Sequence, residues 1–400
     1  MELISLDAAW FTLIAVLGVA LAPTQGLRRA LLLVANAAFL YLFDPLAPLV
    51  FTATALVGYG AARLAARGAP RALVVLASAP LLVPLFLPKL SAYAAPAEGA
   101  AVGNVLGTRL VLFVGASYFT LRALSFVVDA ARRRECTFGL FDFLVWNSFF
   151  PTIVAGPIER ADHFARTYAR LGRPTWEDVS AGVVRIFQGL LKKVVLGGVA
   201  IRWAAPISGF AAEGALQPSW GMAWLALYAI CLYAWFDFAG YSDLAIGVGR
   251  LMGVRLAENF DNPYLRPSIS EFWQGWHLSL SFWIRDYLFL PMCGRSRSVL
   301  RPHVAALTSM GLCGLWHSPN LGWLLWGLLH GLGLSVHQAW THWMRKRFAL
   351  KKKLAKSTAY RVVCVVLTFH FVAFTWTFIA IDAQQVGPTL RYLMVLVGLG

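Results

Sequence analysis

Two histidines, His277 and His317, are the side chains of this chain best suited to moving a proton. Each directly follows a tryptophan, and they lie 40 residues apart. An imidazole has an unperturbed pKa close to neutrality, so it can accept a hydroxyl proton and return it later. One well-placed base is worth about 10²–10⁴-fold in rate. His277 and His317 are therefore the candidate catalytic residues.

Attack of a hydroxyl on an ester or thioester also requires a donor that stabilises the oxyanion that forms. Three groups near the histidines are candidates for this role, and the sequence leaves all three open. They are His277, a backbone amide near Gly314, and the side chain of Asn320.

The histidines lie in an unusual stretch, Glu258 to Gly331, where polar and charged residues interrupt an otherwise apolar chain. A polar group in lipid or in buried protein costs several kcal/mol unless it has a partner. The stretch therefore reads as an active site inside a membrane, with the rest of the chain as its scaffold.

Non-catalytic roles compete with this hypothesis. A histidine in a membrane helix often forms a hydrogen bond between helices, and we expect such structural roles for His330, His337, His342 and His370. The charged residues Asp237, Asp243, Arg285 and Asp286 also suit ion pairs at helix ends. Asp237 and Asp243 could join the two histidines around a metal, but no compact ligand spacing exists, so we predict no metal site.

The composition is typical of a membrane protein. The chain is 59% hydrophobic and only 14% charged, against about 25% charged residues in soluble proteins, and its mean hydropathy is +0.64. Sixteen tryptophans and 27 phenylalanines fit aromatic belts at two membrane faces. We therefore expect an all-α polytopic membrane protein in contact with the lipid bilayer.

The net charge of +16 is distributed in short clusters between apolar segments. Such clusters mark cytoplasmic loops, and no motif of a nucleic-acid-binding fold accompanies them. Nucleic acid is therefore not an expected partner. The clusters are Arg28–Arg29, Arg132–Arg134, Lys192–Lys193 and Met344–Lys356.

The elements that position the histidines follow from periodicity and from prolines. Residues 270–289 show apolar and aromatic side chains at helical spacing, which predicts one helix with His277 on its aromatic face. Pro319 disfavours helical geometry at the residue before it, so His317 should lie at a helix end. Residues 138–155 contain Pro151 and read as a short or re-entrant segment. The glycine-rich run after Asp237 predicts a broken or tightly packed helix.

Five blocks in order resemble the bacterial branch of the membrane-bound O-acyltransferases, in particular the alginate O-acetyltransferase-like subgroup. They cover roughly residues 108–381. The blocks are GASYFTLRALSFVVD from Gly115, FFPTIVAGPIERADHF from Phe149, GLLKKVVLG from Gly189, WFDFAGYSDLAIGVGRLMG from Trp235, and the stretch from Glu258 to Gly331.

This resemblance implies a bundle of about 10–12 transmembrane helices, with re-entrant and amphipathic segments, around a central tunnel. It implies one integral-membrane acyltransferase domain over residues 1–400, with its core at 108–381 and with C-terminal residues missing. The family's invariant histidine corresponds to His317 and its partner to His277. One departure is Ser318-Pro319, where we expect a glycine after the catalytic histidine.

The function that the resemblance implies is transfer of an acyl group, acetyl in the first instance, to hydroxyls of an exported, alginate-like polysaccharide. The expected donor is acetyl-CoA or an acyl carrier protein, with no bound cofactor, and His317 is the expected base. Expected partners are periplasmic acetyl-transfer or polysaccharide-export proteins, and the expected location is the bacterial inner membrane, as a multi-pass protein. Residues expected to line the tunnel are Trp273, Trp276, Trp316, Asn320, Asp286, Arg285, Tyr241 and Asp243.

Three alternatives remain from the sequence. One is D-alanyl transfer from a carrier protein to teichoic acid. Another is a transporter or pore in which the histidines relay protons. The third is a non-catalytic assembly scaffold, which would tolerate loss of both histidines.

Overall fold

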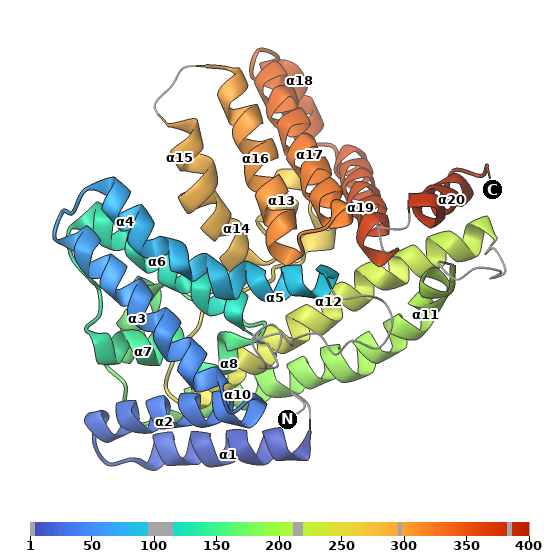
Figure 1. Cartoon of the computed structure of the whole chain (residues 1–400). Coiled ribbons are helices and arrows are strands. Elements are labelled where there is room, and N and C mark those ends of the chain that lie inside the picture. Colours follow the sequence, from blue (N-terminus) through green and yellow to red (C-terminus); the bar gives the residue numbers. More distant parts are fainter. Residues whose placement is uncertain (1–4, 95–114, 211–218, 295–297, 382–385, 400) are drawn as a thin grey trace. The chain divides into compact units, whose positions relative to one another are not determined.

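The computed structural model describes residues 5–94, 115–210, 219–294, 298–381 and 386–399. Within these ranges every regular element is helical (Figure 1). Four of the described helices are long and apolar enough to cross a membrane: α2, α3, α12 and α19, with bounds Gln25–Phe43, Ala47–Ala66, Trp220–Leu251 and Thr358–Ala380. The predicted class is confirmed: the chain is an all-α polytopic membrane protein. The total number of spans and the central tunnel stay predictions.

The chain forms two compact units. The first comprises Met1–Leu190 and Tyr241–Glu258, and the second comprises Leu191–Gly240 and Asn259–Gly400. Helix α12 contributes to both, because the boundary falls between Gly240 and Tyr241. The single domain expected over residues 1–400 stays a prediction.

The first unit contains most of the helices before residue 190. Polar caps begin two of them: Ser5 accepts a hydrogen bond from the Ala8 N–H, and Thr24 accepts one from the Leu27 N–H. Its remaining helices are α1 (Leu6–Leu21), α4 (Arg71–Ser78), α5 (Leu82–Ala94), α6 (Ala116–Arg133), α7 (Leu140–Asn147), α8 (Phe150–Ile153), α9 (Ala161–Tyr168) and α10 (Trp176–Leu190).

The core of the first unit surrounds a buried arginine. Arg122 projects from α6 and is fully buried. Its guanidinium donates hydrogen bonds to the carbonyl oxygens of Trp146, Asn147, Thr152 and Pro157. These carbonyls lie at the end of α7, in α8 and in the chain after α8, so one side chain ties the two short helices together.

The second unit is built on α16 and α17, which lie side by side (Figure 1). The pair has the bounds Leu300–His317 (α16) and Leu321–Arg345 (α17). The other helices of this unit, besides α19 and the first part of α12, are α11 (Gly197–Phe210), α13 (Ile269–Trp273), α14 (Leu278–Ile284), α15 (Leu290–Cys293), α18 (Phe348–Ala355) and α20 (Val386–Leu396). The unit also has π-helical segments at Leu191–Leu196 and Arg285–Phe289 and a 3₁₀ turn at Pro263–Leu265, and the first unit has a 3₁₀ turn at Ala79–Leu81.

Two expectations for the connecting regions hold. Residues 138–155 form the short helices α7 and α8 rather than one span. The run after Asp237 is tightly packed: a Cβ on Gly247 would lie 2.7 Å from the Gly182 carbonyl oxygen of α10. It is not broken, because α12 continues through it to Leu251.

Two further regions contain more helix boundaries than a simple reading gives. The apolar run 72–88 continues from α4 into α5 through a 3₁₀ turn at Ala79–Leu81, where Pro80 lacks a backbone N–H. The polar stretch 159–180 contains α9 and the start of α10.

Candidate active site

The hairpin of α16 and α17 positions His317. Glycines let the two backbones approach, as small residues do in membrane helix pairs. A Cβ on Gly314 would lie 2.0 Å from the Trp323 carbonyl oxygen, and one on Gly327 would lie 2.2 Å from the Met310 carbonyl oxygen. The end of α16 is therefore held closely against the first turns of α17.

His317 is the last residue of α16, as Pro319 predicted. Ser318 is extended and its N–H closes the helix onto the Gly314 carbonyl. Asn320 then caps α17, where its side-chain oxygen accepts the Trp323 N–H at 2.9 Å. Ser318 and Pro319, the departure from the family pattern, thus lie in the two-residue gap between a helix end and a cap.

Tryptophan rings surround the imidazole of His317. Trp323 stacks on it, with ring centroids 4.5 Å apart and planes 19° apart. Trp316 and Trp326 meet it edge-on, at 4.6 and 5.7 Å. His317 is only half-buried, whereas Trp316 and Trp326 are buried. The ring is therefore held by flat apolar walls and still has accessible surface for a reactant.

His277 lies at a break in the helix that the sequence predicted over residues 270–289. That prediction is wrong: α13 ends at Trp273 and α14 starts at Leu278. His277 lies between them with a φ of 43°, in the left-handed region that a non-glycine residue seldom adopts. The helical spacing of the apolar residues is real, but it does not reveal this break.

The segment Asn259–Asp261 explains the break. The Asp261 N–H donates to the Gly275 carbonyl at 2.8 Å, and the Leu278 N–H donates to the Asn259 carbonyl at 2.9 Å. The Asn259 side-chain oxygen also accepts from the backbone N–H of Ser279. A Cβ at position 275 would lie 2.6 Å from the Asp261 carbonyl, so only glycine permits this approach. Tertiary hydrogen bonds outcompete the helical ones here.

His277 lies within electrostatic range of His317. His277 is 1% exposed and packs edge-on against Phe238 at 4.5 Å. The two imidazoles interact electrostatically. A buried imidazole within that range of a more accessible one suits a helper that assists a base.

The other predicted residues of the second unit divide into two groups. Trp273, Trp276 and Trp316 are buried in the aromatic cluster. Trp276 packs against Phe260 and Trp376 rather than against either histidine. Arg285 and Asp286 pair with each other at 2.8 Å in the π-helical turn after α14. Turns of that kind are frequent at functional sites.

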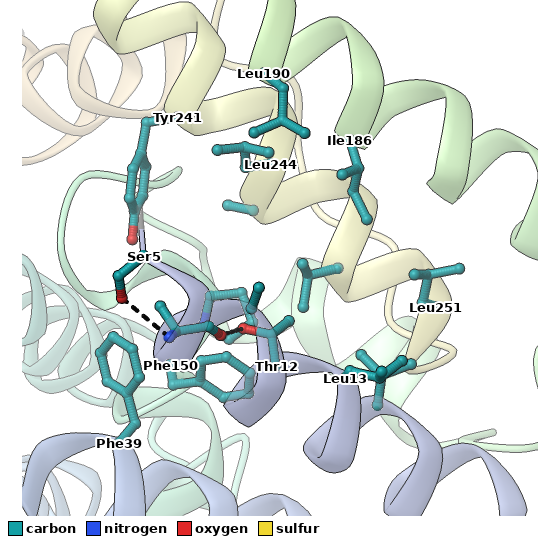
Figure 2. A pocket seen from close by; sticks show the side chains of 16 residues that line it. Ser5, Thr12, Leu13, Phe39, Phe150, Ile186, Leu190, Tyr241, Leu244 and Leu251 are labelled. Carbon is teal, nitrogen blue, oxygen red and sulfur yellow. Dashed lines mark hydrogen bonds between the residues drawn. The ribbon is translucent and has the colours of Figure 1, made fainter. Parts of the chain in front are cut away.

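Tyr241 and Asp243 belong to the first unit. Asp243 is buried and accepts a hydrogen bond from Arg185 Nε at 2.7 Å, which matches the ion-pair alternative of the sequence analysis. Tyr241 lines a cavity of about 340 Å³ between α1, α10 and α12 (Figure 2). The cavity walls are almost entirely apolar, with Ser5 and Thr12 as the other hydroxyl-bearing residues.

Sequence reasoning missed part of the aromatic wall. Trp323, Trp326 and His330 recur at i, i+3 and i+7 and project from one side of α17. Trp323 and Trp326 contact His317, and Trp326 also contacts His330. The sequence signal for this wall was the helical spacing of the three aromatic side chains in the helix that begins after Asn320. Among the described residues, no group of three His, Cys, Asp or Glu side chains could hold a metal ion.

Comparisons with known proteins identify the family of this chain. The model of the MBOAT, or membrane-bound O-acyltransferase, family matches residues 81–380. The probable alginate O-acetylase AlgI of Pseudomonas fluorescens is 36% identical over 248 residues, which cover 60% of this chain and 48% of that protein. The chain thus spans about half the length of its alginate O-acetylase relatives.

Two further relatives are named for other acyl-transfer activities. The peptidoglycan O-acetyltransferase of Helicobacter pylori is 28% identical over 318 residues, covering 72% of this chain and 58% of that protein. The teichoic acid D-alanyltransferase of Bacillus subtilis is 29% identical over 277 residues, covering 66% and 68%. All three matched proteins are named for acyl transfer. The chain belongs to the membrane-bound O-acyltransferase family.

Proposed function

We propose that this protein is an O-acyltransferase of the bacterial inner membrane. It takes an acyl group, acetyl in the first instance, from a cytoplasmic thioester and passes it to hydroxyls of an exported polysaccharide. The observation that carries the proposal is the half-buried His317 at the end of α16, enclosed by tryptophans and next to the buried His277. Family membership and the three named relatives support it.

In the proposed reaction His317 accepts the proton of the acceptor hydroxyl as its oxygen attacks the thioester carbonyl. The tetrahedral intermediate then collapses, the carbon–sulfur bond breaks, and the leaving thiolate takes the proton from His317. An ester and a free thiol result, so atoms and charge balance.

Of the three candidate groups for stabilising the oxyanion, we prefer the one that is not already used within a helix or a helix cap. Gly314 lies inside α16, where backbone N–H groups are bonded along the helix. Asn320 uses its side-chain oxygen to cap α17, which orients that side chain toward the helix. His277 is therefore the preferred donor, since it is buried and lies near His317.

The transferred group could also be D-alanyl, as in the name of the teichoic acid D-alanyltransferase relative. We take a carrier protein as the donor for that alternative. We expect the acyl donor and periplasmic acetyl-transfer or polysaccharide-export proteins as partners. Purified protein is incubated with radiolabelled acetyl-CoA or with D-alanyl carrier protein, each with a polysaccharide acceptor. The proposal predicts free thiol and esterified acceptor in equal amounts from acetyl-CoA.

Two other outcomes separate the alternatives. Esterification only from the D-alanyl carrier protein moves the assignment to that donor. No esterification from either donor, together with movement of a solute that requires His317, would support a transporter and reject the enzymatic proposal.

A further inference from the structure

We propose that His330 is a positioning residue. It is a neutral imidazole, fixed in one tautomer by hydrogen bonds, and it holds Trp326 in place against His317. The inference rests on the proposed function. It assigns a role to a buried histidine that the transfer chemistry itself does not use.

The hydrogen bonds of His330 determine its tautomer. The indole N–H of Trp273 can only donate, and it donates to His330 Nδ1 at 3.2 Å. Nδ1 is therefore an acceptor without a proton. Thr375 donates its hydroxyl hydrogen to the Val372 carbonyl at 2.7 Å. Its oxygen is left to accept from His330 Nε2 at 2.9 Å, so Nε2 carries the proton.

This arrangement prevents His330 from acting as a second base. Both ring nitrogens are occupied, and the side chain is fully buried. A proton added at Nδ1 would face the N–H of Trp273 and break that bond. His330 instead ties α17 to α13 through Trp273 and to α19 through Thr375.

Trp326 connects this fixed ring to His317. Its centroid lies 4.6 Å from His330, 5.8 Å from Trp273 and 5.7 Å from His317. Its own indole N–H is buried with no hydrogen-bond partner among the described residues. No hydrogen bond of its own therefore sets the orientation of Trp326. Ring packing sets it: His330 is the nearest ring, Trp323 lies 5.4 Å away and Trp273 lies 5.8 Å away. A shift of His330 therefore moves a ring that contacts His317.

The test separates the two bonds of His330 with conservative variants. In His330→Asn the amide oxygen can still accept from Trp273. In His330→Gln the longer side chain can still donate to Thr375. His330→Phe keeps a ring but loses both bonds. The exposed His342 on the same helix gives the matched control, His342→Phe.

Transfer from acetyl-CoA is measured per folded molecule, as kcat and KM across pH. Because misplacement of about 1 Å near a reacting group can cost about 10²-fold, we expect His330→Phe to lower kcat by about ten- to a hundredfold. We expect KM for acetyl-CoA to change less than about twofold, since uniform binding is retained. His330→Asn should recover part of kcat, and His342→Phe should match the wild type.

The pH profile distinguishes positioning from a structural role. In His330→Phe the single titration of kcat/KM should persist, because His317 is the titrating base, but its midpoint should shift because the wall around His317 has moved. If His330→Phe and His330→Asn fold and keep the wild-type kcat and midpoint, the inference is overturned. Loss of that titration in His330→Phe would overturn it as well, because His330 would then be the base.

Failure of the proposed function has a different signature: the wild type and every His330 variant then esterify no acceptor. Transfer by His317→Ala at the wild-type rate would instead remove His317 as the base and leave the acyl transfer itself standing. If fold stability prevents measurement of His330→Phe, the comparison of His330→Asn with His330→Gln decides: the inference expects Asn, which keeps the Trp273 bond, to be the more active of the two.

Discussion

Each unit encloses one side chain with polar nitrogens, and the two surroundings differ. Arg122 in the first unit is buried and donates to carbonyl oxygens of α7, of α8 and of the chain after α8. His317 in the second unit is half-buried, is surrounded by tryptophan rings and keeps accessible surface. A guanidinium stays protonated at all relevant pH values, whereas an imidazole titrates near neutrality. Burial alone therefore does not identify a site; the kind of group and its surroundings do.

The largest loss of stability is expected when the buried guanidinium of Arg122 is removed. Arg122→Met keeps an unbranched apolar stem but removes one donor from four carbonyl oxygens. Because leaving a buried polar group unsatisfied costs about 1–3 kcal/mol, we expect the loss of this set of hydrogen bonds to lower the stability of the folded state strongly. The midpoint of thermal unfolding in detergent and the yield of monodisperse protein measure this. Wild-type unfolding of Arg122→Met would show that the carbonyls find other partners.

A substitution at Gly314 tests whether close packing of α16 against α17 positions His317. Gly314→Ala places a methyl group 2.0 Å from the Trp323 carbonyl, which is backbone and cannot easily move. We expect a cost of about 1–3 kcal/mol and a loss of acetyl transfer per folded molecule, since α16 must move away from the helix that carries Trp323. Gly311→Ala is the control, because its nearest neighbour is the flexible Leu328 side chain at 3.3 Å. Equal activity in the two variants would argue against close helix packing as the device that sets His317.

The smallest expected effect concerns a histidine outside both sites. His163 on α9 contacts the buried Glu159 carboxylate, and this hydrogen bond raises the pKa of His163 although burial and Arg166 oppose it. The stabilisation that this pair gives to the folded state is fully present below the pKa of about 6.5 that an unfolded histidine has. It is lost as the pH rises through the higher pKa of His163 in the folded protein. The expected size is at most about 1 kcal/mol.

Thermal unfolding measured from about pH 5.5 to pH 8 checks this sign. The wild type should lose stability relative to His163→Gln as the pH rises. A difference that stays constant or grows with pH would mean that the ring is not protonated in this pair.

Sequence reasoning predicted the class, the family and the end of α16 at His317, because composition, ordered motifs and a proline act locally. It did not predict the break at His277. Helical periodicity runs through residues 270–289. The helix is interrupted by hydrogen bonds to Asn259 and Asp261, which precede that stretch and which the periodicity does not reveal. His330 was assigned a structural role from its type alone. Its tautomer and its link to Trp326 depend on Trp273 and Thr375, from two other helices.

The most direct test of the central claim is a single-turnover measurement of acetyl transfer with His317→Ala. Saturating radiolabelled acetyl-CoA and a hydroxyl acceptor are used, with His342→Ala as the matched control on the same hairpin. If His317 is the base, His317→Ala folds normally and transfers acetyl at least about 10²-fold more slowly, while His342→Ala matches the wild type. Transfer by His317→Ala at the wild-type rate would rule out His317 as the base.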